Sequence, residues 1–207
     1  MTLTEPIIKN IVFDMGNVLM TFNGPYFATR FSDNEQDAAL LQAAYFGRGE
    51  WALLDSGTIG YPTMLRIAEA HLPERLWPNL HDMAAHWARY SEPICEVNDL
   101  ARHLYEQGYD LYLLSNAGTR IDEQLDHCPA YPLMKGRVVS AEEKLMKPDP
   151  AIYELLCRRY GLVPAECLFV DDNADNCRGA EVAGMQAFHF TGDVAALAAA
   201  IGLSPQR

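Results

Sequence analysis

Three short apolar runs in this sequence each end at a polar residue. The runs and the residues that follow them are 7–13 before Asp14, 110–114 before Ser115, and 167–170 before Asp171. Runs of this length, rich in β-branched and aliphatic residues, are typical of buried strands. Two weaker strand candidates lie at 137–140 and 187–190.

Amphipathic helical patterns separate these runs. Apolar residues recur with a helical period at about 97–105, 150–160 and 175–183, and a glycine follows each pattern near the point where a helix would end. An alanine-rich stretch at 194–201 predicts a terminal helix packed on the core. Strands that alternate with helices indicate βαβ units, so the sequence predicts an α/β fold with a parallel sheet.

The segment 21–90 differs from the rest because its patterns are helical only. They fall at 37–45, 61–72 and 79–90, and the segment holds all three tryptophans. We expect a small helical domain at 21–90, inserted between the first and second strands of a core formed by 1–20 and 91–207. Trp51 and Trp87 are expected in the interior of this insertion, where either could also line a substrate cavity.

Composition narrows the function classes. The 207 residues carry 16 Lys and Arg against 28 Asp and Glu, a formal charge of −12, with no run of basic residues. This balance argues against nucleic acid as a partner. No apolar run approaches the ~20 residues that span a bilayer, and residues 1–10 lack a secretion signal, so we expect a cytoplasmic protein without a membrane partner. The five cysteines form no C-x-x-C pair and are expected to be reduced. The sequence does not indicate the oligomeric state.

The polar residues that follow the three runs form the main functional signal. Ligands of open parallel sheets bind beyond the carboxyl ends of the strands, so Asp14, Ser115 and the pair Asp171 and Asp172 should meet there. Two carboxylates about 4 Å apart repel each other by roughly 4 kcal/mol at an effective dielectric constant of 20. Mg²⁺ relieves such repulsion and prefers carboxylate oxygens, water and phosphate as ligands. The alternative is that each residue only caps a turn or a helix.

Two further segments could bind a phosphate. Ser115 and Asn116 follow the second run and are expected to open a helix, whose first N–H groups would bind phosphate oxygens beside the serine hydroxyl. Lys147 precedes a Pro-Asp-Pro sequence that fixes the backbone near it, so its ammonium group is available to a phosphate. Alternatively, Ser115 is only a helix cap and Lys147 is a surface lysine.

Four segments together resemble a known family. They are F-D-M-G-N-V-L at 13–19, L-S-N at 114–116, K-P-D-P at 147–150 and F-V-D-D-N at 169–173. Their order and spacing resemble the four motifs of the haloacid dehalogenase superfamily of hydrolases, and the helical insertion resembles the C1-type cap of that family. The resemblance implies a Rossmann-like, doubly wound parallel sheet in three αβα layers. The Asp-x-Gly-Asn pattern is similar to a subset close to sugar-phosphate phosphatases.

The resemblance also implies roles for the residues of the motifs. Asp14 would be the nucleophile that attacks phosphorus and forms an aspartyl-phosphate. Mg²⁺ would be bound by the carboxylates of Asp14 and Asp172 and by the backbone carbonyl of Gly16, with Asp171 bound directly or through water.

The phosphoryl group would be bound by three residues that follow or lie between the strands, namely Ser115, Asn116 and Lys147. Ser115 and Lys147 would also stabilise the charge of the transferring group. The cap would close over a small phosphorylated metabolite and exclude water.

One position departs from the family pattern. Family phosphatases usually carry a second Asp two residues after the nucleophile as general acid and base, and here that position is Gly16. A positioned acid or base contributes roughly 10²- to 10⁴-fold to the rate. We expect a cap residue, a metal-bound water or a good leaving group to replace it. Candidate cap residues are Glu50, Asp55 and His86.

Three functions remain open at this point. The first is a Mg²⁺-dependent phosphatase for a small phosphorylated metabolite, with sugar phosphates as one candidate. The second is a 2-haloacid dehalogenase, in which Asp14 attacks carbon without a metal. Asp171 and Asp172 argue for a metal instead, and the arginine closest after the first motif, Arg30, is 16 residues from Asp14. The third is a phospho-ligand-binding protein with weakened catalysis, which rests on Gly16 alone.

Overall fold

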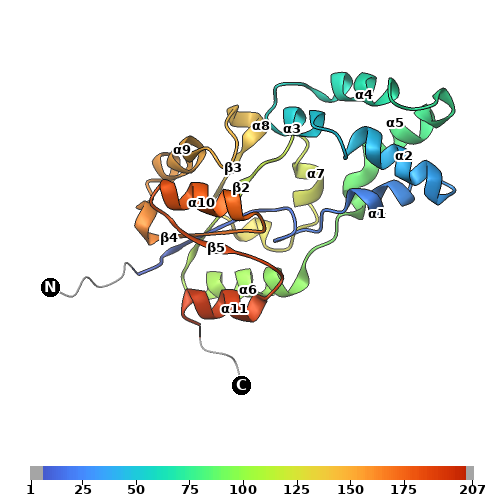
Figure 1. Cartoon of the computed structure of the whole chain (residues 1–207). Coiled ribbons are helices and arrows are strands. Elements are labelled where there is room, and N and C mark those ends of the chain that lie inside the picture. The colour runs from blue at the N-terminus through green and yellow to red at the C-terminus, as the bar shows by residue number, and fades with distance from the viewer. Residues whose placement is uncertain (1–6, 204–207) are drawn as a thin grey trace.

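A computed structural model describes residues 7–203 of the chain, with one central parallel sheet (Figure 1). The strands are β1 (Asn10–Phe13), β2 (Asp110–Ser115), β3 (Gly136–Val139), β4 (Cys167–Asp171) and β5 (Gln186–His189). Their order is β3-β2-β1-β4-β5, and all neighbours are parallel. The chain therefore builds outwards from β1 in both directions, which confirms the predicted doubly wound fold.

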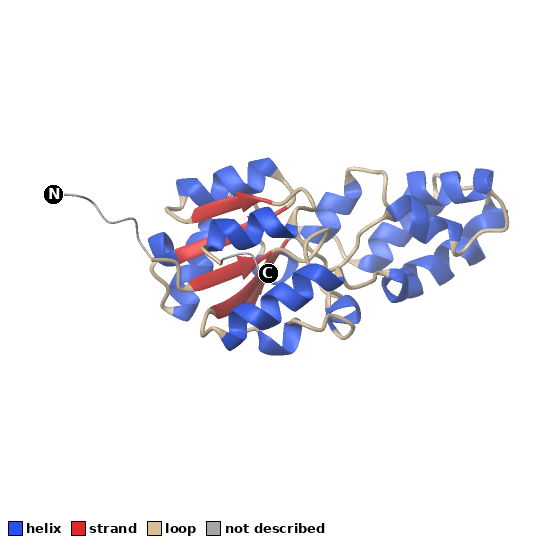
Figure 2. Ribbon diagram, turned by 90° about the horizontal axis from the view of Figure 1, so that it is seen from below, coloured by secondary structure: helices blue, strands red, loops and turns tan. Residues whose placement is uncertain are grey.

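Helices cover both faces of the sheet (Figure 2), and successive residues of β1 face opposite layers. Ile11 and Phe13 share a cluster with side chains of α6 (Cys95–Glu106) and α11 (Val194–Ile201). Val12 faces the other layer, formed by α9 (Pro150–Tyr160) and α10 (Ala174–Val182). Because helices cover both faces, the strands are apolar along their whole length, which is why they appear as continuous runs in the sequence.

Local signals set several element boundaries. Asp149 accepts a hydrogen bond from the Ala151 N–H at 2.9 Å and so caps α9, and Gly161 ends the helix with φ of 68°. β1 begins at Asn10, later than the apolar run at 7–13 suggests. Shorter helices complete the core: α7 (Asp122–Leu125), η3 (Tyr131–Leu133), α8 (Ser140–Glu143) and η4 (Pro164–Glu166).

Helices alone occupy the segment between β1 and the helix that precedes β2. They are α1 (Gly24–Thr29), α2 (Glu35–Tyr45), α3 (Glu50–Asp55), α4 (Tyr61–Glu69), η1 (Glu74–Leu76), α5 (Trp77–His86) and η2 (Trp87–Tyr90). Their apolar side chains form a cluster separate from those of the sheet, around Phe27, Leu41 and Met64. We call these helices the cap; the domain boundaries after 20 and after 90 stay a prediction.

The two chain segments that join cap and core run side by side. The Thr21 N–H donates to the Glu92 carbonyl at 2.8 Å, and the Ile94 N–H donates to the Leu19 carbonyl at 2.9 Å. The Ser91 hydroxyl adds a bond of 2.7 Å to the Thr21 carbonyl. The outgoing and returning segments are therefore held together at the boundary.

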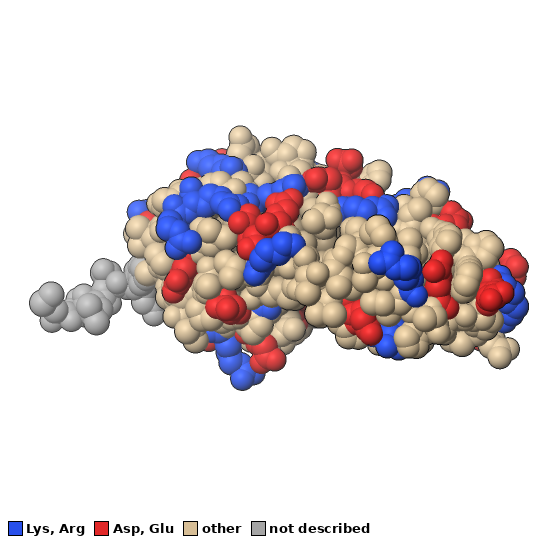
Figure 3. Space-filling view, turned by 90° about the horizontal axis from the view of Figure 1, so that it is seen from above, with Lys and Arg blue, Asp and Glu red and all other residues tan. Residues whose placement is uncertain are grey.

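The remaining expectations concern cysteines, charge and membranes. All five cysteines are free. On the face that Figure 3 shows, basic and acidic side chains are interspersed rather than gathered into a basic stripe. Between residues 7 and 203, no helix is both long and apolar enough to cross a bilayer.

Candidate active site

The carboxyl ends of the three central strands bring the expected polar residues together. Asp14 directly follows β1, Ser115 ends β2 and Asp171 ends β4. The Asp14 N–H donates to the Val170 carbonyl at 2.9 Å, which continues the pairing of β1 with β4 to the very end of the sheet. All three side chains are buried. The meeting of these residues follows from the parallel register alone.

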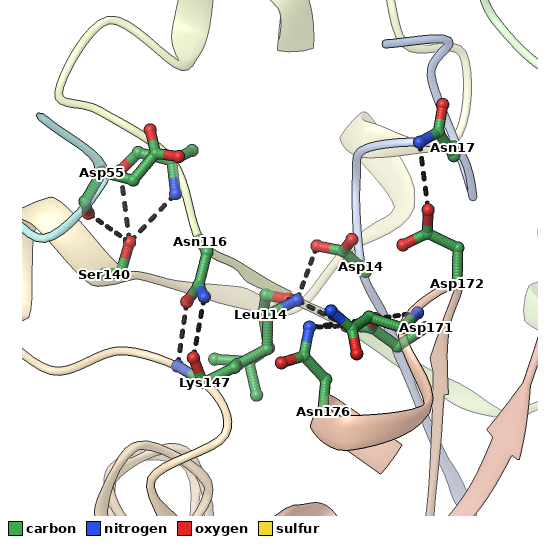
Figure 4. A network of polar contacts seen from close by, with 12 residues as sticks. Asp14, Asn17, Asp55, Leu114, Asn116, Ser140, Lys147, Asp171, Asp172 and Asn176 are labelled. Carbon is green, nitrogen blue, oxygen red and sulfur yellow. Dashed lines mark hydrogen bonds and ion pairs between the residues drawn. The ribbon is translucent and has the colours of Figure 1, made fainter. Parts of the chain in front are cut away.

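Lys147 joins this group as a buried cation (Figure 4). Its Nζ lies 2.8 Å from Asp14 Oδ1 and 2.6 Å from Asp171 Oδ2, and it donates to the Leu114 carbonyl at 3.1 Å. Only 4% of the residue is exposed. Lys147 is therefore a core residue that faces two carboxylates, and its interpretation as a surface lysine is wrong.

The charges in this group influence each other. Burial raises the pKa of Asp14 to about 6; the Asp171 charge also raises it, while Lys147 opposes the shift. Burial by itself would lower the pKa of Lys147, but the two carboxylates outweigh it and the pKa is raised. The site thus places the ammonium group of Lys147 between the carboxyl groups of Asp14 and Asp171.

The consecutive aspartates Asp171 and Asp172 have different surroundings. Asp171 is fully buried and accepts hydrogen bonds from Asn176 Nδ2 at 3.1 Å on each oxygen, from the Asn173 N–H at 2.8 Å and from Lys147. Asp172 is partly exposed and lines the active-site pocket. Asp171 is therefore a buried residue that positions Lys147 and Asn176, while Asp172 is available to a ligand.

Asn17 orients Asp172, a role that the sequence analysis did not assign. Its Nδ2 donates to Asp172 Oδ2 at 3.0 Å, and its Oδ1 accepts from the Phe22 N–H at 3.1 Å. The backbone of Asn17 has a φ of 54°, in the left-handed region that Asn tolerates better than most residues. Its place in the Asp-x-Gly-Asn pattern was the signal that could have identified it.

Asn116 holds the backbone of Lys147. Its Nδ2 donates to the Lys147 carbonyl and its Oδ1 accepts from the Lys147 N–H, both at 2.9 Å. The helix expected to open at Ser115 is absent, and the next helix is α7. The physical reason is that the loop is bound from outside: Asn116 is bonded to Lys147, and the Ala117 N–H donates to Ser140 Oγ at 2.9 Å. The expectation of a phosphate site at a helix start after β2 is therefore wrong.

A cavity of about 180 Å³ opens between the strand ends and the cap. Its core side includes Asp14, Gly16, Ser115, Asn116 and Asp172, and its cap side includes Phe22, Trp51, Asp55, Tyr61 and Trp87. The Phe22 ring centroid lies 5.7 Å from that of Trp51 and 5.6 Å from that of Trp87. Both tryptophans thus belong to the apolar interior of the cap and also line the cavity.

Of the three candidate cap acids, the structure brings one into the cavity. Glu50 is paired with Arg48 at 3.1 Å, and His86 Nδ1 lies 2.6 Å from Asp82 Oδ1; neither lines the cavity. Asp55, at the end of α3, does line it.

Asp55 has an unusual pKa for an aspartate. Burial raises it to about 7, against the lowering effect of hydrogen bonds from the Gly118 N–H and the Trp51 side chain. The charge of Asp14 adds to the rise and that of Lys147 opposes it. Asp55 is therefore near enough to the strand ends to sense their charges, and it changes protonation near neutral pH.

Arg120 also lines the cavity, and sequence patterns did not single it out. Its guanidinium donates to Glu123 at 2.5 and 2.8 Å and to the carbonyls of Ala84 and Ala85 at 3.0 and 2.9 Å. It also lies 5.0 Å from the centroid of the Tyr61 ring. Arg120 thus connects the core to cap helix α5 and has most of its N–H groups occupied.

Three carboxylates could hold a metal ion. Asp14, Asp171 and Asp172 each offer one oxygen, and these oxygens lie within 4.8 Å of one another. Gly16, whose carbonyl is the fourth expected ligand, lines the same cavity. Clustered carboxylate oxygens beside an open cavity suit a hard cation such as Mg²⁺, which keeps water or substrate oxygens as further ligands.

Comparison with known proteins yields relatives with two chemistries. Sesquiterpene phosphatase astK from Aspergillus oryzae is 27% identical over 191 residues, covering 90% of this chain and 92% of that protein. (S)-2-haloacid dehalogenase 4A from Burkholderia cepacia is 34% identical over 88 residues, covering 37% of this chain and 34% of that protein.

The fold is shared with solved enzymes. One is a haloacid dehalogenase family enzyme from Bacteroides thetaiotaomicron in complex with magnesium and inorganic phosphate, with a TM-score of 0.66 and 20% identity, covering 90% of this chain and 96% of that one. The family model described as haloacid dehalogenase-like hydrolase matches residues 8–184. This chain therefore belongs to the haloacid dehalogenase-like hydrolase family.

Proposed function

We propose that the protein is a Mg²⁺-dependent phosphatase that hydrolyses a small phosphorylated metabolite through an aspartyl-phosphate on Asp14. The observation that carries the proposal is the cluster of three carboxylates, Asp14, Asp171 and Asp172, with the buried Lys147 beside it. Such a site suits a cation and a dianionic phosphate together. The phosphatase that aligns with 90% of this chain, and the magnesium and phosphate in the Bacteroides enzyme, support the same chemistry.

The residues present fit the metal. Asp14 and Asp172 would bind it through carboxylate oxygens, and Gly16 would bind it through its carbonyl. Asp171 already accepts four hydrogen bonds, so it would act on the ion through water or through its neighbours. The bound cation would neutralise the phosphate and lower the pKa of Asp14.

The nucleophilic step uses Asp14. One carboxylate oxygen of Asp14 attacks phosphorus in line, and the bond from phosphorus to the leaving oxygen breaks. Ser115 lines the cavity and would bind an oxygen of the transferring group. Lys147 lies behind Asp14, with its Nζ bonded to Asp14, Asp171 and the Leu114 carbonyl, and its charge would stabilise the negative charge of that group. Water then attacks phosphorus, the bond to Asp14 breaks, and free phosphate and the Asp14 carboxylate result.

The cavity restricts the substrate. Its volume of about 180 Å³ suits a small molecule, and its cap side is formed by the rings of Phe22, Trp51 and Trp87. Aromatic rings favour a leaving group with an apolar surface that can pack on them, such as the C–H face of a sugar or a short hydrocarbon chain. Sugar phosphates therefore remain candidates, beside phosphate esters of apolar alcohols.

The dehalogenase alternative requires a cation for the substrate carboxylate. Arg30 stacks on the Tyr90 ring, 5.0 Å from its centroid, and does not line the cavity. Arg120 does line it, but its donors are taken by Glu123 and two cap carbonyls. Arg30 thus lies outside the cavity, and most of the Arg120 N–H groups are held by Glu123 and the cap, which favours the phosphatase.

Two parallel assays test the proposal. One measures p-nitrophenyl phosphate hydrolysis with Mg²⁺ and with EDTA, and the other measures chloride release from a 2-haloacid. We expect hydrolysis of the phosphate ester that is lost with EDTA and in Asp14→Asn, and no chloride release. Chloride release that is insensitive to EDTA would indicate the dehalogenase. Metal-dependent binding of phosphate without turnover would indicate a binding protein. A panel of sugar phosphates and short alkyl phosphates would then identify the leaving group.

A further inference from the structure

We propose that Asp55, carried by the cap, is the general acid and base of this enzyme and replaces the carboxylate that is missing at Gly16. This inference rests on the proposed phosphatase function. It assigns to one side chain both proton transfers of the reaction. Three independent features of the structure support it: the position of Asp55, the state of the other acids in the cavity, and the way the core holds the end of α3.

The first feature is position. In an in-line displacement the leaving oxygen departs on the side of phosphorus opposite the nucleophile. Asp14 attacks from the strand ends, so the leaving group points towards the cap. Asp55 lies on the cap side of the cavity that Asp14 lines from the core side. A carboxyl group placed there can reach the leaving oxygen.

The second feature is that the other carboxylates of the cavity are occupied. Glu123 is held by two hydrogen bonds from Arg120, and Asp172 accepts from Asn17 beside the proposed metal site. Within residues 7–203, Asp55 takes part in no ion pair with a basic side chain. Asp55 is therefore the cavity carboxyl that has neither an ion pair nor a place in the proposed metal site, so it can exchange a proton with the substrate.

The third feature is that the core fixes the end of α3. Ser140 Oγ donates to the Asp55 carbonyl at 2.5 Å, and Lys144 Nζ donates to the Gly57 carbonyl (Figure 4 shows the first contact). Gly57 has a φ of 65°, and an added Cβ would lie 2.5 Å from the Ala141 carbonyl oxygen. The core thus packs closely against the backbone of Gly57, two residues after Asp55. This contact sets the position of Asp55 relative to Asp14.

The protonation of Asp55 suits the role. Its pKa of about 7 results from burial, with Asp14 adding to the rise and Lys147 opposing it. The phenol groups that face the same region, Tyr45 and Tyr61, both have raised pKa values and stay neutral. A group that titrates near the working pH can both give and take a proton efficiently.

The proton balance closes over two steps. Asp55 begins protonated and gives its proton to the leaving oxygen as the bond from phosphorus to that oxygen breaks and the bond to Asp14 forms. The Asp55 carboxylate then takes a proton from water as the water oxygen attacks phosphorus and the bond to Asp14 breaks. The products are the alcohol, inorganic phosphate and the original enzyme with Asp55 protonated.

The test compares Asp55→Asn with Glu50→Gln, which makes the same chemical change on the same helix outside the cavity. Each variant is assayed on an alkyl phosphate, whose leaving alkoxide needs a proton, and on p-nitrophenyl phosphate, whose leaving phenolate does not. For Asp55→Asn we expect kcat/KM on the alkyl ester to fall by roughly 10²- to 10⁴-fold. The fall on p-nitrophenyl phosphate should be much smaller, and the phosphoryl adduct on Asp14 should accumulate, as seen by intact-protein mass spectrometry.

A rescue variant provides the second measurement. Gly16 has room for a side chain, since an added Cβ meets only the Phe22 Cβ, at 3.8 Å. Adding Gly16→Asp to Asp55→Asn restores a carboxyl group at the position usual in the family and should recover alkyl phosphate turnover.

The outcomes separate the two proposals. If the wild-type protein hydrolyses neither ester, the phosphatase function fails. If the wild type is active and Asp14→Asn is not, but Asp55→Asn changes both esters by the same factor and no adduct accumulates, the role of Asp55 is refuted. Selective loss on the alkyl ester with rescue by Gly16→Asp supports it.

Discussion

The Asn116 side chain forms two hydrogen bonds with the backbone of Lys147, one to its carbonyl and one from its N–H, both at 2.9 Å. The ammonium group of Lys147 can sit between Asp14 and Asp171 only if this backbone is fixed. In the proposed phosphatase, Asn116 would thus act on the phosphate through Lys147, and its direct contact with substrate stays a prediction.

Asn116→Ala should weaken phosphate binding by displacing Lys147. Loss of two partly buried hydrogen bonds should lower the free energy of unfolding by about 1 to 3 kcal/mol. We expect kcat/KM for p-nitrophenyl phosphate to fall by roughly tenfold or more, which corresponds to about 1.4 kcal/mol. Asn79→Ala removes a bond of 2.8 Å to the Phe31 carbonyl in the cap and serves as the control. It should reduce stability with kcat/KM retained; equal kinetic losses in both variants would contradict the role of Asn116.

Lys147→Met should unfold more easily than any single exposed-lysine variant. It leaves Asp14 and Asp171 buried without their cation, a change that typically costs about 3 to 5 kcal/mol. The loss should be largest at pH 7 to 8 in EDTA and smaller near pH 5. The reason is that without Lys147 the pKa of Asp14 rises above its present value of about 6, and protonation then removes the repulsion. Urea denaturation at several pH values measures this, with Lys9→Met as the exposed control. A loss that is independent of pH would argue against carboxylate repulsion as its cause.

Asp55 should make the protein less stable as the pH rises. Its folded-state pKa of about 7 exceeds the ordinary value of 3.8, so between these values the folded protein holds a proton that the unfolded chain has released. Stability therefore falls through this range, by at most ~1.4 kcal/mol per pH unit, and the penalty is complete above pH 7.

Asp55→Asn removes this penalty. Its Tm should match that of the wild type near pH 4 and exceed it at pH 8, a stability gain at the expense of activity. Glu50→Gln, on the same helix, should show no such rise, because the pKa of Glu50 is lowered by its hydrogen bond with Arg48. A Tm difference that does not grow with pH would mean that the Asp55 carboxyl is not perturbed in solution.

Mg²⁺ should stabilise the wild-type protein against heat. Binding only to the folded state at a concentration 100 times the dissociation constant adds about 2.7 kcal/mol. Asp172→Asn should abolish most of the Tm increase because it removes a cavity-facing ligand. Asp175→Asn, on the exposed first turn of α10, should keep it. An unchanged Mg²⁺ response in Asp172→Asn would exclude this carboxylate as a ligand.

The core of the fold could be predicted from the sequence because its signals are local. Strands covered on both faces appear as uninterrupted apolar runs, and α9 carries its own cap residue Asp149 and its own terminating Gly161. The parallel arrangement then places Asp14, Ser115 and Asp171 at one edge. Within the cap, α2, α4 and α5 follow the expected periodicity, with ends shifted by a few residues.

The rest depends on contacts between distant segments. α3 spans only six residues, too few to establish a period, and it carries Asp55. The hydrogen bonds of Asn116 and Ser140 replace a helix after Ser115 with a loop, and nothing in that stretch alone signals it. The hydrogen bonds that occupy Arg120 likewise depend on contacts that only the folded chain makes. The same is true of the cavity, which Asp55 lines and Glu50 does not.

The paired segments at the boundary, where Thr21 bonds to Glu92 and Leu19 to Ile94, limit how the cap can move. Because these two connecting segments are bonded to each other, they should bend together far more readily than they twist or slide apart. The cap should therefore tilt as one rigid body. Asp55 moves with the cap, so opening must break the bonds that hold the end of α3 to the core, from Ser140 to the Asp55 carbonyl and from Lys144 to the Gly57 carbonyl. The proton source is thus withdrawn whenever the active site is open to bulk water, and protonation of the leaving group is tied to the closed state of every turnover.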